Sequence, residues 1–254
     1  MDLGLAGKVA LVTGSSRGIG RGIALTLAEE GCDLILHGRD QAALAEVAAE
    51  VGKRGRKAII EANNLHEDGA PAALITAVKR AGGRLDILVN NAGVIYHGDT
   101  EKMTDAQWDR LIGINLHAPL LFIRRLLPLL LAQSEAHILN VCSIYGLVPK
   151  RKLAAYQMSK YALVGLSRSL RCEYSPAGLG VTALCPGLVD TNLLAAARDS
   201  GWISRRFPFP SFLSMSPDRV AARAVRAIYK NKGLVVVGGH ARILWAAHRL
   251  WPRI

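Results

Sequence analysis

The sequence predicts a doubly wound α/β fold, in which one parallel, seven-stranded sheet carries helices on both of its faces. Short apolar runs rich in β-branched residues alternate with longer helical patterns along the chain. These runs are apolar at nearly every position, which is typical of strands that helices cover on both sides. A glycine-rich turn joins the first apolar run to the first helical pattern, as expected where a strand leads directly into a helix.

The order of the elements indicates repeated strand–helix–strand units within one domain over residues 1–254. The chain has 254 residues, half of them hydrophobic, and α/β folds of this length often form a single domain. The expected strands are 9–13, 34–37, 58–62, 87–90, 137–143, 181–185 and 234–237. The expected helices include 21–30, 41–51, 70–81, 108–132 and 155–173.

The N-terminus and the cysteines favour a cytoplasmic protein. Residues 1–5 show no basic region ahead of an apolar run, so we expect no cleaved signal peptide. We also expect no membrane-spanning helix, because Arg124 and Arg125 interrupt the apolar pattern before it reaches about 18 residues. The cysteines show no metal-ligand spacing and are interpreted as reduced thiols, two of them within buried strands. They are Cys32, Cys142, Cys172 and Cys185.

The net charge of +12 comes entirely from the second half of the chain. Residues 1–123 contain 13 Lys and Arg against 15 Asp and Glu, whereas residues 124–254 contain 19 against 5. Solubility without a partner is one explanation, and an anionic membrane surface or an acidic carrier protein is another. Nucleic acid is not expected as a partner, because the sequence has no helix-turn-helix, zinc-finger or aromatic RNA-binding motif.

The turn after the first expected strand has the properties of a phosphate-binding loop. Glycine allows a sharp turn and a close approach of the backbone to a pyrophosphate, whose charge then faces the amides at a helix N-terminus. Its position in an α/β array indicates a dinucleotide site. The spacing is Gly-x-x-x-Gly-x-Gly rather than the more common Gly-x-Gly-x-x-Gly. The expected contacts are Gly14, Ser16, Arg17, Gly18, Ile19 and Gly20.

From residue 8 to about residue 191 the chain resembles the short-chain dehydrogenase/reductase family, which implies a Rossmann-like fold. The resemblance rests on the spacing of the glycine turn and on further motifs in matching order, among them Ser143 thirteen residues before Tyr156. The other motifs are Asn90-Asn91-Ala92-Gly93, Asn115, Tyr156-Gln157-Met158-Ser159-Lys160 and Pro186-Gly187-Leu188-Val189-Asp190-Thr191.

The resemblance assigns catalysis to four residues, Asn115, Ser143, Tyr156 and Lys160. Hydride transfer to a carbonyl leaves an alkoxide, so one group must donate a proton and a second must hold the oxygen. Tyrosine has a pKa of roughly 10, and a nearby cation lowers it. Tyr156 and Lys160 are four residues apart and share one helical face, while Ser143 is expected to end the fifth strand. Asn115, in the fifth helix, resembles the family residue that holds a relay water; the alternative is an amide that caps local backbone.

The predicted cofactor is NADP(H). An NAD-specific enzyme usually has a carboxylate at the end of the second strand, where this chain has Arg39. Arg39 and Arg17 can flank a 2′-phosphate, and both positions match those of NADP(H)-preferring family members. Relatives commonly carry aspartate at Asn64, and asparagine can still bond the adenine. The further cofactor contacts that the resemblance implies are Asn64, Leu65, Asn91, Ala92, Gly93, Tyr156, Lys160, Pro186, Gly187, Val189 and Thr191.

The C-terminal region predicts a substrate lid and an amphipathic helix. Residues 192–216 are irregular and rich in aromatic residues and proline, and so long a loop in a compact domain is more often functional than idle. Residues 240–251 predict a helix with Arg242 and Arg249 opposite its apolar face. That face packs on the body or a partner subunit in one interpretation, and rests peripherally on anionic lipid in the other. It consists of Ile243, Leu244, Ala247, Leu250 and Trp251.

These features predict an NADPH-dependent oxidoreductase that converts a carbonyl to a secondary alcohol, or the reverse, with Tyr156 as general acid and base. The aromatic residues between 202 and 212 favour an apolar ketone of the acyl-chain, sterol or polyketide type. We expect a homodimer or homotetramer and no metal site, with His37 and His137 in core or edge positions. The alternative is a regulatory or scaffold protein that senses NADP(H), a class in which the tyrosine–lysine pair is usually broken.

Overall fold

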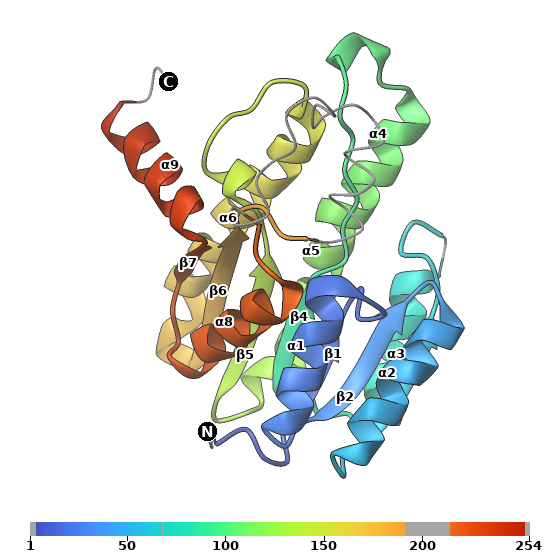
Figure 1. The fold of residues 1–254 in the computed structure, drawn as a ribbon. Helices are drawn as coiled ribbons and strands as arrows, with labels where there is room; N and C mark the ends of the chain where they lie inside the picture. The colour runs from blue at the N-terminus through green and yellow to red at the C-terminus, as the bar shows by residue number, and fades with distance from the viewer. Residues whose placement is uncertain (1–3, 68, 191–213, 252–254) are drawn as a thin grey trace.

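The computed structural model describes residues 4–67, 69–190 and 214–251. One parallel sheet has the strand order β3-β2-β1-β4-β5-β6-β7 (Figure 1). The chain builds outward from β1 to β3, returns to β4 beside β1, and then builds outward to β7, which is the predicted doubly wound topology. The strands are β1 (Val9–Val12), β2 (Asp33–Gly38), β3 (Ala58–Ala62), β4 (Ile87–Asn90), β5 (Ala136–Val141), β6 (Leu179–Pro186) and β7 (Leu234–Val237).

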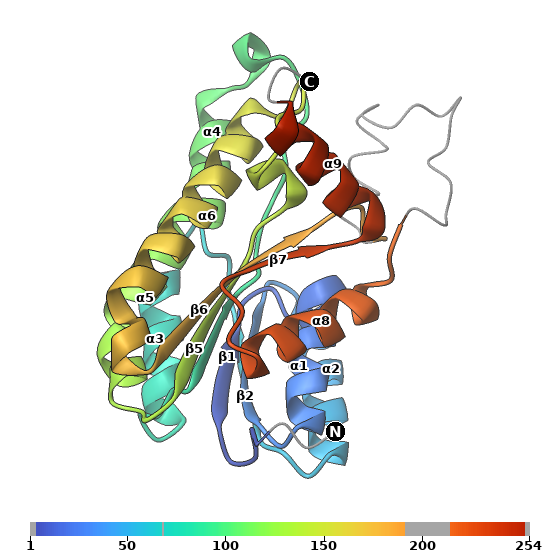
Figure 2. The ribbon, with the colours of Figure 1, turned by 90° about the vertical axis from the view of Figure 1, so that its left-hand side faces the viewer.

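Helices cover both faces of the sheet: α1, α2 and α8 lie on one side, and α3, α5 and α6 on the other (Figure 2). In β1, Ala10 and Val12 enter the core of the first side while Leu11 enters the core of the second. Two buried faces therefore explain why the strands are apolar at successive positions. The helices are α1 (Gly18–Glu29), α2 (Gln41–Lys53), α3 (Ala70–Arg80), α4 (Asp105–Ile112), α5 (Ala118–Leu131), α6 (Ala154–Tyr174), α8 (Pro217–Tyr229) and α9 (Gly239–Leu250).

The predicted strands and helices are present, with ends that differ by at most three residues. The largest difference is in 108–132, which is three segments: α4, a π-helical turn η2 (Gly113–His117) and α5. A capping box between Thr104 and Gln107 starts α4 earlier than the apolar pattern indicates. Helix α8 was not predicted; it begins after Ser216, whose side chain accepts a hydrogen bond from the Arg219 backbone amide.

The predicted lid, residues 192–216, lies outside the described residues except for its last three. Of these, Met215 forms a bridge to Val189, and Ser216 caps α8. The predicted cofactor residue Thr191 also lies outside the described part of the chain.

The helical run Asp105–Leu131 is long and apolar enough to cross a membrane by length and composition, although no spanning helix was predicted. Its inner side belongs to the core of the α/β domain, since Phe122, Leu126 and Leu130 are fully buried against the second side of the sheet. A core helix of this kind passes the same test of length and composition. In the structure the run therefore serves as a core helix.

Helix α9 matches the predicted range, but it packs on the body through a different side from the predicted apolar face. Ala241 is fully buried, and Trp245 packs against the same cluster of core residues. Ile243, Leu250 and Trp251 from the predicted face are instead exposed. The helix is apolar on two sides, so the sequence pattern alone could not show which side meets the body.

A buried polar link holds β5, β6 and the loop before β7 together. The His137 Nε2 atom lies 2.7 Å from Thr182 Oγ1, and that hydroxyl donates to the Lys232 carbonyl oxygen at 2.5 Å. Because the Thr182 proton is used in this way, His137 Nε2 acts as the donor to Thr182. Burial, and secondarily the charge of Arg171, lowers the pKa of His137 from 6.5 to about 3, so the folded protein holds this imidazole neutral.

We predict that His137 makes the fold sensitive to acid. The unfolded chain binds a proton at His137 below a pH of 6.5, whereas the folded chain resists it down to a pH of about 3. The stabilisation by neutral His137 is thus complete above the first value and is lost as the pH falls towards the second. One proton corresponds to about 1.4 kcal/mol per pH unit, or about 2 kcal/mol between pH 7 and pH 5.

Urea unfolding of wild type and His137→Gln at these two pH values measures the difference. The variant should be less stable at neutral pH but should lose less stability on acidification. An equal loss in both proteins would show that His137 does not titrate as described. The comparison is made between proteins because His37, whose pKa is also lowered by burial, titrates in the same direction in both.

Candidate functional site

A cleft of about 860 Å³ lies at the carboxyl ends of the strands and collects most of the predicted site residues. Segments far apart in the sequence meet here because the ends of parallel strands share one edge of the sheet. Gly20 and Asn115 do not line the cleft, and Thr191 is outside the described residues. The predicted residues that line it are Gly14, Ser16, Arg17, Gly18, Ile19, Arg39, Asn64, Leu65, Asn91, Ala92, Gly93, Ser143, Tyr156, Lys160, Pro186, Gly187 and Val189.

The glycine turn between β1 and α1 is closed by contacts that only glycine allows. Gly14 and Gly18 have φ values of +66° and +58°, in the left-handed region. A Cβ atom on Gly20 would overlap the Gly14 carbonyl oxygen and the Asn91 side-chain amide. Gly20 does not line the cleft itself. Its lack of a side chain lets α1 pack closely against the turn. Helix α1 starts at Gly18 with no side-chain cap, so its first amides are available to an anion.

His37 supports the glycine turn from β2. Its Nδ1 atom accepts a hydrogen bond from the Gly14 amide at 3.4 Å, and Nε2 lies 3.2 Å from the Asn63 side-chain oxygen. The ring is buried, and burial is the main cause that lowers its pKa. A neutral ring with its proton on Nε2 satisfies both partners. Sequence reasoning gave His37 only a core or edge position and missed this contact with the turn.

Two exposed arginines line the cleft at its adenosine end. Arg17 lies within the turn as the N-cap residue of α1, Arg39 follows β2, and neither forms an ion pair with another described residue. The neighbouring carboxylate, Asp40, accepts a hydrogen bond from the Ala43 amide at 3.1 Å and so caps α2. Positive charge therefore dominates this end of the cleft.

Three polar side chains gather at the opposite end. Tyr156 and Lys160 come from the first turns of α6 and are 6% and 4% exposed. Lys160 Nζ donates to the Val141 carbonyl oxygen at 2.9 Å and lies 5.7 Å from the centre of the Tyr156 ring. The Ser143 hydroxyl lies beside that of Tyr156 and acts to lower the pKa of the tyrosine. Ser143 was expected to end strand β5. The strand ends at Val141, so Ser143 lies two residues beyond it.

Burial is the main influence on the acidity of Tyr156. Burial raises the pKa of Tyr156 to about 12, and the hydrogen bond with Ser143 acts in the opposite direction. Burial also lowers the pKa of Lys160. The lowering of the Tyr156 pKa by Lys160, whose Nζ lies 5.7 Å from the centre of the Tyr156 ring, stays a prediction, and burial is the largest effect on both groups. Tyr156 is consequently protonated at neutral pH.

Asn115 lies in the π-helical turn η2 and is fully buried. Its side-chain oxygen accepts from the Val94 amide at 2.8 Å, and its amide donates to the Val94 carbonyl at 2.9 Å and to Ser159 at 3.2 Å. The Asn115 side chain therefore caps the Val94 backbone, which is the second of the two interpretations given for it from the sequence. It still lies near the site, since a Cβ on Gly93 would be 3.4 Å from Asn115 Oδ1 and 3.6 Å from Lys160 Nζ.

The cleft has further lining residues that sequence reasoning missed. They come from the segment after β4, from α4, from the short 3-10 helix η3 (Ile144–Gly146) and from the loop after β6, where no periodic pattern singles them out. Leu188 is linked to the start of α9, since its amide donates to His240 Nε2 at 3.2 Å. The additional residues include Ile95, Tyr96, Gln107, Arg110, Leu111, Tyr145 and Leu188.

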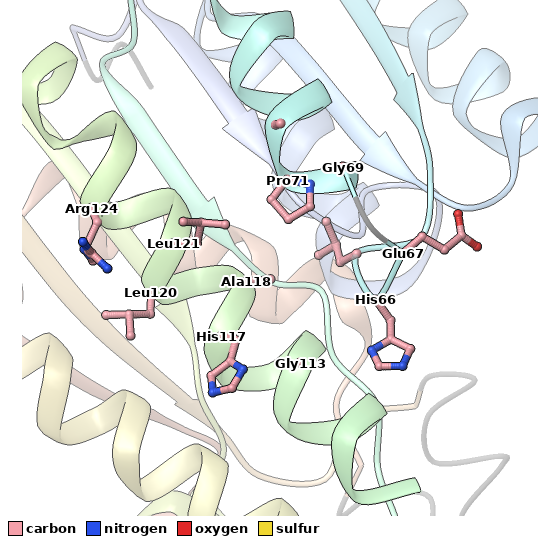
Figure 3. A pocket seen from close by; sticks show the side chains of 12 residues that line it. His66, Glu67, Gly69, Pro71, Gly113, His117, Ala118, Leu120, Leu121 and Arg124 are labelled. Atoms are coloured by element: carbon pink, nitrogen blue, oxygen red, sulfur yellow. The ribbon is translucent and has the colours of Figure 1, made fainter. Parts of the chain in front are cut away.

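A second pocket, of about 520 Å³, lies between the loop before α3 and the η2–α5 segment (Figure 3). It is lined by His66, His117 and Arg124 among apolar residues, and by none of the four predicted catalytic residues. Within the described ranges no group of three His, Cys, Asp or Glu side chains could hold a metal ion. All four cysteines are free thiols, and Cys172 is the exposed one.

Comparison with known proteins gives consistent matches. The family model for short chain dehydrogenases matches residues 8–201. An uncharacterized oxidoreductase of Staphylococcus saprophyticus is 34% identical over 227 residues, covering 88% of this chain and 92% of the relative.

Two solved structures are similar over nearly the whole chain. The structure of L-sorbose reductase from Gluconobacter frateurii with NADPH and L-sorbose has a TM-score of 0.84 at 27% identity, covering 94% of this chain and 98% of that one. A metagenomic short-chain oxidoreductase in complex with NADP has a TM-score of 0.76 at 34% identity, covering 91% and 97%.

We predict that Gly20→Ala weakens nucleotide binding severely, because the added methyl group would push α1 away from the Gly14 carbonyl and open the turn. Binding of NADPH, measured by the enhancement of its fluorescence, should fall by roughly tenfold or more. The matched control is Gly52→Ala in α2, where an added Cβ meets nothing within 4 Å. Wild-type binding by Gly20→Ala would show that the turn does not form the nucleotide site.

Proposed function

The chain belongs to the short-chain dehydrogenase family, and we propose that it uses NADPH to reduce a carbonyl group to a secondary alcohol, or catalyses the reverse reaction. The observation that carries the proposal is the meeting of Ser143, Tyr156 and Lys160 at one end of a cleft whose other end is a glycine turn. The chain is an oxidoreductase of this family, and a nicotinamide cofactor follows from that membership.

The residues of the cleft fit a dinucleotide. The glycine turn leaves a cradle beside the uncapped N-terminus of α1, which suits a pyrophosphate. Asn64, Leu65 and residues 91–93 would hold the adenosine side, and residues 186–189 would hold the nicotinamide side with Thr191. When bound, the nicotinamide supplies the hydride for reduction and accepts it in oxidation.

In the proposed reduction, Tyr156 donates its hydroxyl proton to the carbonyl oxygen as the carbon gains the hydride. The raised pKa of Tyr156 keeps this hydroxyl in the donor form at neutral pH. Ser143 would hold the same oxygen in line, because it lines the cleft beside Tyr156. Lys160 is the nearest cation to the resulting tyrosinate, and Asn115 holds the backbone beside Lys160 in place.

The preference for NADPH over NADH rests on charge at the adenosine end. The exposed guanidinium groups of Arg17 and Arg39 line the cleft there, and the nearest carboxylate is used to cap α2. A 2′-phosphate would gain charge-assisted hydrogen bonds from these arginines. The two similar structures were solved with NADPH and with NADP, which agrees with the proposal.

For the substrate we propose an apolar ketone, of the acyl-chain, sterol or polyketide type. Supporting side chains among the described residues are Ile95, Leu111 and Leu188, which line the cleft near the catalytic end. A cytoplasmic homodimer or homotetramer remains part of the proposal. The alternative, an NADP(H)-sensing regulatory protein, is disfavoured because such a protein has no need of an intact Ser143, Tyr156 and Lys160 set.

We predict that Tyr156→Phe lowers kcat for ketone reduction by roughly a hundredfold or more, because the proton donor is lost. NADPH should still bind normally, since only a hydroxyl is removed. The control is Tyr161→Phe, which makes the same change at an exposed tyrosine of α6 and should leave turnover unchanged. Near-normal turnover by Tyr156→Phe, followed as NADPH oxidation with a panel of ketones, would exclude Tyr156 as the acid.

We predict that Arg39→Asp raises the Kd for NADPH by roughly tenfold to a hundredfold and changes the Kd for NADH much less. The change removes a cation and places a carboxylate beside the 2′-phosphate. The control is Arg21→Asp, the same change at an exposed arginine of α1 outside the cleft. If Arg39→Asp weakened both cofactors equally, Arg39 would not contact the 2′-phosphate.

A further inference from the structure

The side of α9 that points away from the body is an apolar stripe, here called the outer ridge and formed by Ile243, Ala246 and Leu250. Ile243 and Leu250 are 72% and 85% exposed, and Ala246 is exposed between them. Trp251 and Leu244 extend the exposed apolar surface on one flank. Single exposed apolar side chains are common, but a spacing of three and four residues along one helix makes a continuous surface.

The outer ridge is not needed to hold α9 in place. The helix is attached through Ala241 and Trp245 and through the Arg242 side chain, whose Nε donates to the Val236 carbonyl oxygen at 3.1 Å. Figures 1 and 2 both show α9 on the outside of the molecule, at the β7 edge of the sheet. Polar residues in the outer ridge would therefore cost the fold little.

Positive charge accompanies the outer ridge. Arg242 and Arg249 are seven residues apart, two helical turns, and so flank it on the same side. The helix contains no Asp or Glu, and residues 198–254 as a whole contain 11 Lys and Arg against 2 Asp and Glu. The Arg249 guanidinium lies 5.3 Å from the centre of the Trp245 ring. An apolar stripe bordered by arginines with a tryptophan at its end suits the interface of an anionic bilayer.

We propose that α9 lies in the surface of an anionic membrane, with the outer ridge among the acyl chains and Arg249 at the headgroups. A second copy of this chain is a less suitable occupant, because two-fold packing of α9 on itself would bring the same arginines together. An acidic carrier protein would match the arginines but would offer no hydrocarbon to the outer ridge. This proposal does not depend on the proposed reductase activity.

The docking surface would be connected to the cleft. Helix α9 begins directly after β7 and hence at the carboxyl edge of the sheet, where the cleft lies. His240 in its first turn accepts the hydrogen bond from the amide of Leu188, a lining residue. A helix of this length extends about 18 Å from that point. Docking would thus bring the substrate end of the cleft close to the lipid, where an apolar ketone would be concentrated.

Flotation of the full-length protein with vesicles tests the proposal. We expect binding to vesicles of phosphatidylglycerol and phosphatidylcholine at low salt, weaker binding as salt rises, and little binding to pure phosphatidylcholine. The double variant Ile243→Gln/Leu250→Gln keeps the charge and should bind roughly tenfold more weakly or worse. Its control is Tyr229→Gln, at an exposed apolar side chain on α8.

A second pair of variants tests the charge. Arg249→Gln should weaken binding to anionic vesicles. Arg223→Gln, the same change at an exposed position of α8, should leave binding unchanged. Absence of vesicle binding at low salt, or full binding by the Ile243→Gln/Leu250→Gln variant, would overturn the proposal. So would a lower mass for that variant in light scattering, which would assign the outer ridge to a second copy. The flotation experiment contains no cofactor or substrate, so it does not depend on catalysis. A protein that floats with vesicles but has no reductase activity would contradict the proposed function and leave the membrane proposal intact.

Discussion

The hydrogen bonds between Asn91 and the turn after β1 are the constraint on which the rest of the site depends. The Asn91 side-chain amide donates to the carbonyl oxygens of Thr13 and Gly14 at 2.9 and 3.0 Å. In return, Thr13 Oγ1 accepts from the backbone amides of Asn91 and Ala92. These bonds join the two halves of the sheet at the edge where the cleft opens, and they set how closely Gly20 brings α1 to the turn. The shape of the proposed nucleotide site therefore depends on the packing between the ends of β1 and β4.

Burial controls the chemistry at the other end of the cleft. The same low-dielectric surroundings raise the pKa of Tyr156 and lower that of Lys160, so each group is pushed towards its neutral form. Cys142 and Cys185, both buried, contribute to the surroundings of the two residues. A neutral tyrosine suits proton donation, and the tyrosinate that results would need the positive charge of Lys160 and of a bound nicotinamide.

Part of the excess positive charge of the second half of the chain lies on helix α9. The excess of Lys and Arg in the second half includes Arg242 and Arg249 on α9, which begins at the same sheet edge as the cleft. Helix α9 is held to the body by Ala241 and Trp245, on another side from the outer ridge, and by the hydrogen bond from Arg242 Nε to the Val236 carbonyl oxygen. The outer ridge is therefore exposed without being needed to attach α9.

The sequence by itself determined the sheet and the glycine turn, because periodicity and glycine spacing are local properties, while the roles of Ser143, Tyr156 and Lys160 are what the family resemblance implies. It could not show that the Asn115 side chain is hydrogen-bonded to the Val94 backbone, that His37 supports Gly14, or that burial raises the pKa of Tyr156. It also could not decide which apolar side of α9 meets the body. Those outcomes depend on which distant segments share a buried volume, and hydrogen-bond partners, desolvation and packing are fixed only when that volume is filled.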